Sequence, residues 1–358
     1  MAVCTNFFLG VNNAAGFYSL FDELRDTEAI TDFLILKGGP GVGKSTMMKY
    51  IAAQGAQKGF DIEYIRCSGD PDSYDVVRFP QYGILIADGT APHVMEPMYP
   101  AAVDRYVNLG RFYDIERLKE RRREIIACTD GYKREYQKAY ASLRAARAVT
   151  REMEGEMQAL WNGEKCEKRL QNIWKRERGH SLGKRARTTR RFLGGLTTKG
   201  RVNCEETLYT LCDHIYELDD SFHLAAAGLQ RLADQIVQEG CDVILCPDPD
   251  APERLAHVLV PELHLGFVTT NRAFRLTRIP YRRLRVDQML EQEALHERRQ
   301  ELKLKGKLAE ALEAEAIDHL RLAGEKHDEL ELIYHPFVNF DGVMALAEEE
   351  SRRIFSRI

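Results

Sequence analysis

Residues 33–46 read FLILKGGPGVGKST, and our prediction of the fold starts from them. Four apolar residues, 33–36, come before the glycines and predict a short buried strand. From Gly38 to Ser45 the sequence follows the pattern G-x-x-x-x-G-K-[ST], which is typical of a phosphate-binding P-loop. Residues 45–58 contain no proline and predict a helix whose positive N-terminal end faces the phosphates. A strand, a glycine-rich loop and a helix in this order predict the binding of a nucleoside triphosphate, with ATP as the expected substrate.

The loop itself supplies the predicted phosphate-binding groups. Glycines are needed there because backbone N–H groups must approach phosphate oxygens in conformations that a Cβ atom would obstruct. Lys44 would reach the β- and γ-phosphates, and the Ser45 hydroxyl would bind Mg²⁺, the expected cofactor. The predicted cofactor-binding residues are Gly38, Gly39, Pro40, Gly41, Val42, Gly43, Lys44, Ser45 and Thr46.

A second apolar strand, GILIAD at residues 83–88, ends in a carboxylate. In P-loop proteins such a strand places an aspartate beside Mg²⁺, so Ser45 and Asp88 are the predicted metal ligands. The alternative role for Asp88 is to cap the end of the strand. Many P-loop ATPases carry a glutamate directly after this aspartate to activate water, but here Gly89 follows.

Other residues must therefore polarise the attacking water or an acceptor hydroxyl. Asp70, Asp72 and His93 lie just beyond predicted strand ends, where parallel α/β sheets bind their ligands. We predict Lys44, Asp88, Asp70 and His93 as catalytic residues. Two alternatives stay open, because the sequence Asp-Pro-Asp is good turn chemistry and a lone histidine is weak evidence for catalysis.

Composition restricts the class of protein. A chain of 358 residues with 44% apolar and 30% charged residues predicts a globular protein of about two domains. The net charge of −4 gives no overall attraction to nucleic acid or to an anionic membrane. No apolar run is long enough to span a membrane, and the first residues lack the basic start of a signal peptide. The eight cysteines contain no C-x-x-C pair, which fits reduced thiols and predicts a cytoplasmic protein without structural zinc.

Two long segments are charged and helical in pattern. From Ile115 onward one apolar stripe recurs every three or four residues, and a second stripe runs from about Asp287 to Leu322. We expect the two helices to form an antiparallel hairpin, with their tyrosines and methionines packed against the partner helix. The first stripe consists of Tyr132, Tyr136, Tyr140, Leu143, Ala146, Val149, Met153, Met157 and Leu160.

The sequence repeats itself with an offset of about 181 residues. The residues that recur at this offset are Ala52, Gln54, Gln57, Gly59 and Asp61, which meet Ala233, Gln235, Gln238, Gly240 and Asp242. The repeat fails where the chemistry lies: Leu224, Ala225 and Ala226 replace the Gly-Lys-Ser of the loop, Asp219 and Asp220 replace its first two glycines, and Thr269 replaces Asp88. We predict a second P-loop-like lobe that has lost nucleotide binding; two unrelated α/β lobes are the alternative.

The predicted fold class is therefore α/β. It has a parallel-sheet core of the P-loop NTPase type, internally duplicated with a degenerate second lobe, and long helical hairpin segments. The predicted domains are a nucleotide-binding lobe at 1–114, a helical segment with a basic linker at 115–190, the degenerate lobe at 191–285 and a C-terminal helical segment at 286–358.

Several stretches resemble one known family. LKGGPGVGKST at 36–46, CSGDPDS at 67–73, IADGTAPHV at 86–94, LTTKG at 196–200 and HDELE at 327–331 are similar to bacterial two-lobed P-loop proteins that are assigned only a general ATPase function. The resemblance covers nearly the whole chain, and DGTAPH is more specific than the P-loop. It implies the two-lobed fold and ATP binding. In that family both lobes commonly carry a P-loop, so the degenerate second loop is a departure that puts a second nucleotide site in doubt.

Three functions fit these observations. A slow ATPase or ATP-driven switch ranks first, a small-molecule or nucleotide kinase second, and a nucleic-acid-associated ATPase third. The third rests on residues 165–201, which hold 13 Lys or Arg against Glu167 and Glu177, with Trp161 and Trp174 as stacking surfaces. A basic linker that covers an acidic surface is the alternative. A protein partner or a homo-oligomer stays open.

An arginine from the second half could also complete the ATP site. P-loop proteins often take an arginine from a neighbouring domain to stabilise charge at the γ-phosphate. We predict that Arg190 or Arg191, within Arg185–Arg201, plays this part. Neutralisation of acidic groups such as Asp219 and Asp220 is the competing role.

Overall fold

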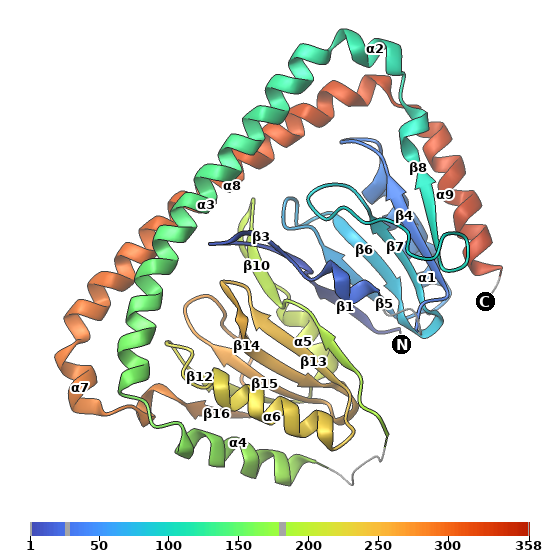
Figure 1. Cartoon of the computed structure of the whole chain (residues 1–358). Helices are drawn as coiled ribbons and strands as arrows, with labels where there is room; N and C mark the ends of the chain where they lie inside the picture. Colours follow the sequence, from blue (N-terminus) through green and yellow to red (C-terminus); the bar gives the residue numbers. More distant parts are fainter. Residues whose placement is uncertain (1, 26–28, 179–183, 357) are drawn as a thin grey trace.

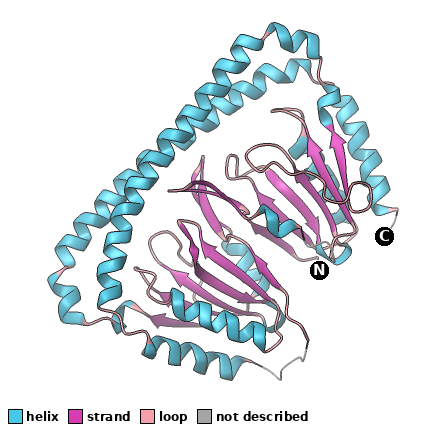
Figure 2. Cartoon of the chain, in the orientation of Figure 1, coloured by secondary structure: helices cyan, strands magenta, loops and turns pink. Residues whose placement is uncertain are grey.

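The computed structural model describes residues 2–25, 29–178, 184–356 and 358. Two lobes, each built on a six-stranded sheet, lie beside a long helical hairpin (Figure 1). Sheets and helices are both abundant, so the fold is α/β with long helices, as predicted (Figure 2). No helix in the described part of the chain is long and apolar enough to cross a membrane.

The first sheet contains the strand predicted before the glycine-rich loop, as β4, in the second position from one edge. Its strands, in spatial order, are β1 (Cys4–Phe7), β5 (Ile62–Arg66), β6 (Tyr74–Phe79), β7 (Ile84–Asp88), β4 (Asp32–Lys37) and β8 (Asp104–Asn108). Strand β6 runs antiparallel to both neighbours, so the sheet is mixed and the prediction of an all-parallel core was wrong. A short connection, residues 80–83, turns the chain from β6 into β7, and antiparallel strands are the pair that such a turn can join.

The second sheet repeats this arrangement. Its strands, in matching order, are β9 (Thr188–Arg190), β13 (Val243–Asp248), β14 (Ala251–Val260), β15 (Leu265–Thr270), β12 (His214–Asp219) and β16 (Arg282–Arg285). Here β14 takes the antiparallel place of β6. The identical order and directions agree with the internal repeat. Strand β9 belongs to this sheet although we placed residues 188–190 in the linker.

A small sheet joins the two halves. It has the order β11 (Gly200–Asn203), β10 (Gly194–Thr197), β2 (Gly10–Asn13) and β3 (Gly16–Ser19), so each half contributes one hairpin. The Asn12 side chain donates a hydrogen bond to the Leu196 carbonyl at 2.9 Å. Phe8 and Phe192 exchange backbone hydrogen bonds of 2.9 Å and are both buried in one apolar core shared by the lobes. The two lobes therefore pack as one unit.

The helical hairpin consists of α3 (Arg122–Ala159) and α8 (Arg299–Tyr334), which run antiparallel along one side of the molecule (Figure 1). Ala139 and Leu143 of α3 pack with Ala316 and Leu320 of α8, as the apolar stripes predict. The shorter helices α2 (Ile115–Glu120) and α7 (Gln292–Glu297) precede these two arms. At 1.5 Å per residue each arm is over 50 Å long, so it connects the far ends of the two lobes.

At the ends of the two long helices, each half of the chain contributes a helix to the lobe that the other half builds. Helix α4 (Glu164–Glu177), from the first half of the chain, packs on α6 (Ala226–Gln238) of the second lobe. Helix α9 (Phe340–Phe355), from the second half, packs on α1 (Lys44–Gln57) of the first lobe. The remaining helix, α5 (Glu205–Leu211), covers β1. Each lobe is therefore completed by the other half of the chain.

Candidate functional site

Residues 38–43 connect β4 to α1 and form the predicted loop. Gly41 and Gly43 have φ angles of +67° and +95°, a left-handed conformation that residues with a Cβ atom rarely adopt. Between them Val42 is 1% exposed and fixes the loop to the core below. The loop therefore has the glycines where its backbone requires them.

The predicted lysine and aspartate meet above this loop. Strands β4 and β7 pair in parallel with Leu36 opposite Asp88, which brings the end of β7 beside the loop. The Lys44 Nζ donates hydrogen bonds to the carbonyl oxygens of Gly38 at 2.7 Å and Gly39 at 3.1 Å. It also lies 3.5 Å from the Asp88 Oδ2. In this state the loop's own carbonyl groups and Asp88 hold the lysine.

Several polar groups around the lysine have no protein partner. The Ser45 hydroxyl oxygen is buried and makes no hydrogen bond. Within the described residues, the backbone N–H groups of Val42 and Gly43 also find no protein acceptor. Buried polar groups in folded proteins are normally paired, so the Ser45 hydroxyl points to a polar ligand, to which the two neighbouring N–H groups could also donate.

The same residues fit a magnesium ion. Asp88 Oδ1 accepts hydrogen bonds from the Thr90 N–H at 2.8 Å and the Thr90 hydroxyl at 2.6 Å, which fixes the carboxylate and leaves Oδ2 on the side of Lys44. Magnesium prefers oxygen ligands and is usually held by one or two protein groups plus substrate phosphates. The described residues contain no cluster of three or more His, Cys, Asp or Glu suited to a metal. A Mg²⁺ ion here would thus depend on Ser45, Asp88 and the phosphates.

A glutamate from the distant helical arm reaches into the loop. The Gly41 N–H donates a hydrogen bond of 3.1 Å to the Glu331 Oε1, near the C-terminal end of α8. Around it, His335 also lies against Gly41, and the Tyr113 hydroxyl donates to the Pro40 carbonyl at 2.8 Å. A carboxylate therefore occupies a backbone donor that a phosphate would use. Sequence reasoning noticed HDELE at 327–331 but gave Glu331 no role.

His93 lies behind the site and has a structural environment. It is 7% exposed, its ring stacks on Phe21 at 4.3 Å, and its Nε2 lies 3.3 Å from the Asp75 Oδ1. Burial alone would lower the pKa of His93, but the Asp75 carboxylate, with a smaller effect from Asp88, raises it above its ordinary value. The ring is enclosed, which favours the structural role over the predicted catalytic one.

Asp70 and Asp72 form the turn that was the alternative interpretation. Asp70 accepts hydrogen bonds from the Asp72 N–H at 3.2 Å and the Ser73 hydroxyl at 2.5 Å. Asp72 forms an ion pair with Lys199, in the turn between β10 and β11. The Thr198 hydroxyl of that turn donates to the Gly69 carbonyl at 2.8 Å. The second half thus fixes this loop of the first lobe through LTTKG.

The corresponding loop of the second lobe has the same length but different residues. Residues 220–225 connect β12 to α6, and β12 begins at His214 while β4 begins at Asp32, a difference of 182. The loop positions therefore match one residue later than the offset of 181 predicts. His223, the counterpart of Gly41, keeps a left-handed φ of +56°. Ala226 stands where the first lobe has Lys44.

An internal carboxylate fills this second loop. Asp220, which is fully buried, accepts hydrogen bonds from the N–H groups of Leu224 at 2.9 Å and Ala225 at 2.8 Å. Burial raises the pKa of Asp220, while these two hydrogen bonds and His223 act in the opposite direction. The predicted acidic residue thus accepts hydrogen bonds from the backbone N–H groups of its own loop.

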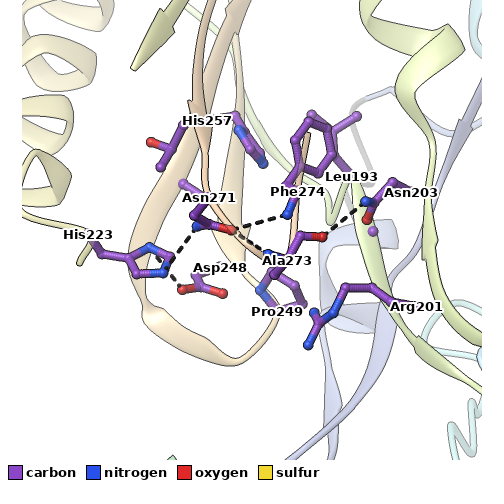
Figure 3. A pocket seen from close by; sticks show the side chains of 13 residues that line it. Leu193, Arg201, Asn203, His223, Asp248, Pro249, His257, Asn271, Ala273 and Phe274 are labelled. Carbon is purple, nitrogen blue, oxygen red and sulfur yellow. Dashed lines mark hydrogen bonds and ion pairs between the residues drawn. The ribbon is translucent and has the colours of Figure 1, made fainter. Parts of the chain in front are cut away.

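Beside it lies a small closed pocket (Figure 3). His223 Nδ1 is 3.4 Å from the Asp248 Oδ2, and its Nε2 is 3.2 Å from the Asn271 Nδ2. Asn271 Oδ1 accepts from the N–H groups of Ala273 and Phe274, so it closes the loop after β15. The cavity holds about 20 Å³, room for a single water molecule and not for a nucleotide.

The predicted arginines lie away from the first loop. Arg191 is 1% exposed, and its Nε lies 2.7 Å from the Glu63 Oε1 on β5. The neutralising role fits this pair, although the partner is Glu63 and not the predicted acids of the second loop. Arg190, on β9, pairs with Leu245 in the second sheet. The expected approach of either residue to the phosphates is not supported.

Much of the basic segment is neutralised inside the protein. Its ion pairs join Arg176 to Glu177, Arg178 to Glu239, Lys184 to Asp242 and Glu262, Lys199 to Asp72, and Arg201 to Asp250 and Glu313. Trp174 is buried and donates to Glu239, so it offers no stacking surface. Residues 179–183 lie outside the described part of the chain. The linker interpretation therefore fits most of the segment.

Comparison with protein-family models, with curated proteins and with solved structures gives no match. The case for any function consequently rests on the geometry of the site and on the sequence motifs.

Proposed function

We propose that the chain binds one Mg²⁺–ATP in the loop of the first lobe, hydrolyses it slowly and uses it as a conformational switch. The observation that carries this proposal is the set of polar groups without protein partners around Lys44. The N–H groups of Val42 and Gly43 and the hydroxyl of Ser45 are arranged as donors and ligands for an anion with its metal.

The residues of the chain would bind the triphosphate in a defined way. The loop N–H groups would receive the phosphate oxygens, and Lys44 would exchange the Gly38 and Gly39 carbonyls for the β- and γ-phosphates. Ser45 and Asp88 would hold Mg²⁺, which would neutralise negative charge on the phosphates. Bringing phosphates between Lys44 and Asp88 would part the present ion pair.

Slow hydrolysis follows from the missing base. Gly89 follows Asp88, His93 is enclosed against Asp75 and Phe21, and Asp70 is engaged in its own turn. The chain thus offers positioning and charge stabilisation without a well-placed group to activate water. Such a site favours a long-lived ATP state, which suits a switch better than rapid turnover.

Glu331 is the group that would move when ATP binds. A phosphate oxygen and the Glu331 carboxylate both need the Gly41 N–H, and two negative charges about 4 Å apart repel by roughly 4 kcal/mol at an effective dielectric constant of 20. ATP would therefore displace Glu331 from the loop. Because Glu331 lies near the end of α8, its displacement would act on the helical arm and, through it, on the second lobe.

The test is a calorimetric titration with ATP and Mg²⁺ in the wild type, in Glu331→Gln and in Glu325→Gln. We expect one site per chain and, in Glu331→Gln, about ten-fold tighter binding, because the competing charge is removed. Glu325 is on the same helix, pairs with Arg321 and is exposed, so its variant is the matched control and should bind like wild type.

Two binding sites per chain, or equal affinity in all three proteins, would contradict the proposal. ADP release measured with and without candidate acceptors separates the switch from a kinase. ADP formation that depends on an added acceptor would favour the kinase.

A further inference from the structure

A basic groove lies on the second lobe, far from the ATP loop in sequence. Helix α4 and strand β16, side by side at the lower edge of Figure 1, surround a hollow of about 660 Å³. Its lining residues are Lys165, Arg169, Ile279, Pro280, Tyr281, Arg282, Arg283, Arg285, Gln288 and Met289. Five of these carry a positive charge and none a negative one.

Most of this charge has no partner. Arg283 pairs with Glu217, but within the described residues the remaining four cations of the groove form no ion pair. On α4, Glu164 pairs with Lys168 and Glu167 with Arg231, so its nearby acids are engaged elsewhere. Asp219 lies opposite Arg285 in the strand pairing and opposes part of the charge. The groove remains strongly positive in a chain whose net charge is −4.

The groove also presents an aromatic ring. Tyr281 is 47% exposed, and His214 supports it from one side in a parallel stack with ring centres 4.1 Å apart. The Arg282 guanidinium lies 5.7 Å from the Tyr281 ring centre. Next to them the apolar side chain of Ile279 is 97% exposed. A supported ring among cations is the combination on which nucleic acid bases stack.

Protection of a sheet edge is the plainer explanation, because charged side chains discourage edge-to-edge aggregation. The first lobe protects its own sheet edge with much less positive charge. Its edge strand, β8, occupies the place of β16 but contains a single arginine, Arg105, whose charge is shared between Asp32 and Glu350. The excess of unpaired cations on β16 and α4 therefore calls for another role.

We propose that this groove binds single-stranded nucleic acid. Its cations would contact the phosphates, and Tyr281 would stack on a base. The concave shape favours a strand over a flat anionic membrane, and the exposed ring favours bases over an acidic peptide. This proposal does not depend on ATP binding by the first lobe.

The test is fluorescence anisotropy of a labelled 20-nucleotide dT strand at 50–200 mM NaCl. We expect binding that weakens linearly on a log–log salt plot, with a slope of about 0.7 per phosphate contact. Arg282→Gln/Arg285→Gln should reduce the slope by about 1.4 and lower the affinity at least ten-fold at 100 mM. Arg122→Gln/Arg123→Gln, which removes two exposed charges from α3, is the matched control and should change the affinity less than two-fold.

Tyr281→Ala separates stacking from charge, since it should lower the affinity about ten-fold without changing the salt slope. Melting temperatures of all variants verify that they fold. Absence of binding at 50 mM NaCl, or equal losses in the groove and control variants, would overturn the proposal. Displacement of the strand by poly-glutamate or by phosphatidylserine vesicles at equal charge concentration would also overturn it, by assigning the groove to an acidic protein or a membrane.

Discussion

The loops at residues 38–43 and 220–225 have the same length, the same flanking strand and helix, and a left-handed residue at the same place. The two loops differ in which carboxylate accepts hydrogen bonds from their backbone N–H groups. In the first lobe it is Glu331, which comes from the long helix α8, accepts from the Gly41 N–H and, in our proposal, is displaced by ATP. In the second it is Asp220, which belongs to the loop and is buried. Asp220 takes the N–H groups of Leu224 and Ala225, whereas their counterparts in the first loop, the N–H groups of Val42 and Gly43, find no acceptor within the described residues and would be open to a phosphate.

The second lobe has a structural reason to persist without a ligand. Helix α4 leaves the first half to cover α6, and α9 returns from the second half to cover α1. Removal of the second half of the chain would therefore also remove helix α9 from α1, the helix that follows the first loop. The second lobe is therefore part of the scaffold that completes the first.

The largest effect is expected from Lys44→Ala. It removes the cation that would bind the β- and γ-phosphates, so ATP turnover should fall on the order of 10³-fold in a phosphate-release assay. The converse change, Ala226→Lys, should not create a second site, because Asp220 still occupies the N–H groups of Leu224 and Ala225.

Calorimetry gives the stoichiometry for both variants. Turnover in Lys44→Ala within a few-fold of wild type would contradict the binding site proposed in the first loop. A second equivalent site in Ala226→Lys would contradict the role of Asp220 in keeping the second loop from binding.

A smaller effect is expected when the second loop loses its internal anion. Asp220→Ala leaves two buried N–H groups without an acceptor and should lower the free energy of unfolding by about 2–3 kcal/mol in urea titrations. Asp213→Ala, an exposed change in the same lobe, is the control and should stay within about 0.5 kcal/mol of wild type. A small loss in Asp220→Ala would mean that the loop does not need its carboxylate.

The local elements were predictable because their signals are local. Apolar runs and glycines fix the strand, the loop and helix α1, and the end of β7 places Asp88 beside Lys44 as expected. Strands β6 and β14 were missed, and with them the mixed character of both sheets. Residues 74–79 follow a turn directly and carry two charged residues, Asp75 and Arg78, which weakened their strand pattern.

The Glu331 contact could not be predicted, since it joins residues 290 positions apart. Its existence depends on the length of α8 and on where the hairpin returns the chain, and neither is encoded near Gly41. The same holds for Arg191: its position at the lobe junction was right, but only the packing of β5 against the second half brings Glu63 to it. Sequence patterns locate elements, whereas long-range packing decides their polar partners.

The smallest expected effect concerns the pKa of Asp287, a carboxyl group beside the second loop. Asp287 is the second residue after β16 in the second lobe, where Gly110 is the second residue after β8 in the first. Burial raises the pKa of Asp287 to about 6, repulsion from Asp220 and Asp219 adds to this, and a hydrogen bond from the Ser221 N–H opposes it. The folded chain therefore holds this proton more tightly than the unfolded chain, whose carboxyl has the ordinary pKa of 3.8.

The stability that this proton provides is complete below pH 3.8 and is lost as the pH rises through about 6. Asp287→Asn copies the neutral form and keeps an oxygen for Ser221. It should raise the free energy of unfolding by on the order of 1 kcal/mol at pH 7.5, because solvent partly screens this charge, and change it little at pH 4. Urea titrations at both pH values measure this, with Asp213→Asn as the control for loss of charge. An equal gain at both pH values would show that the negative charge of Asp287 does not strain the second loop, and the loss of phosphate binding that we predict for this loop would then rest on Asp220 alone.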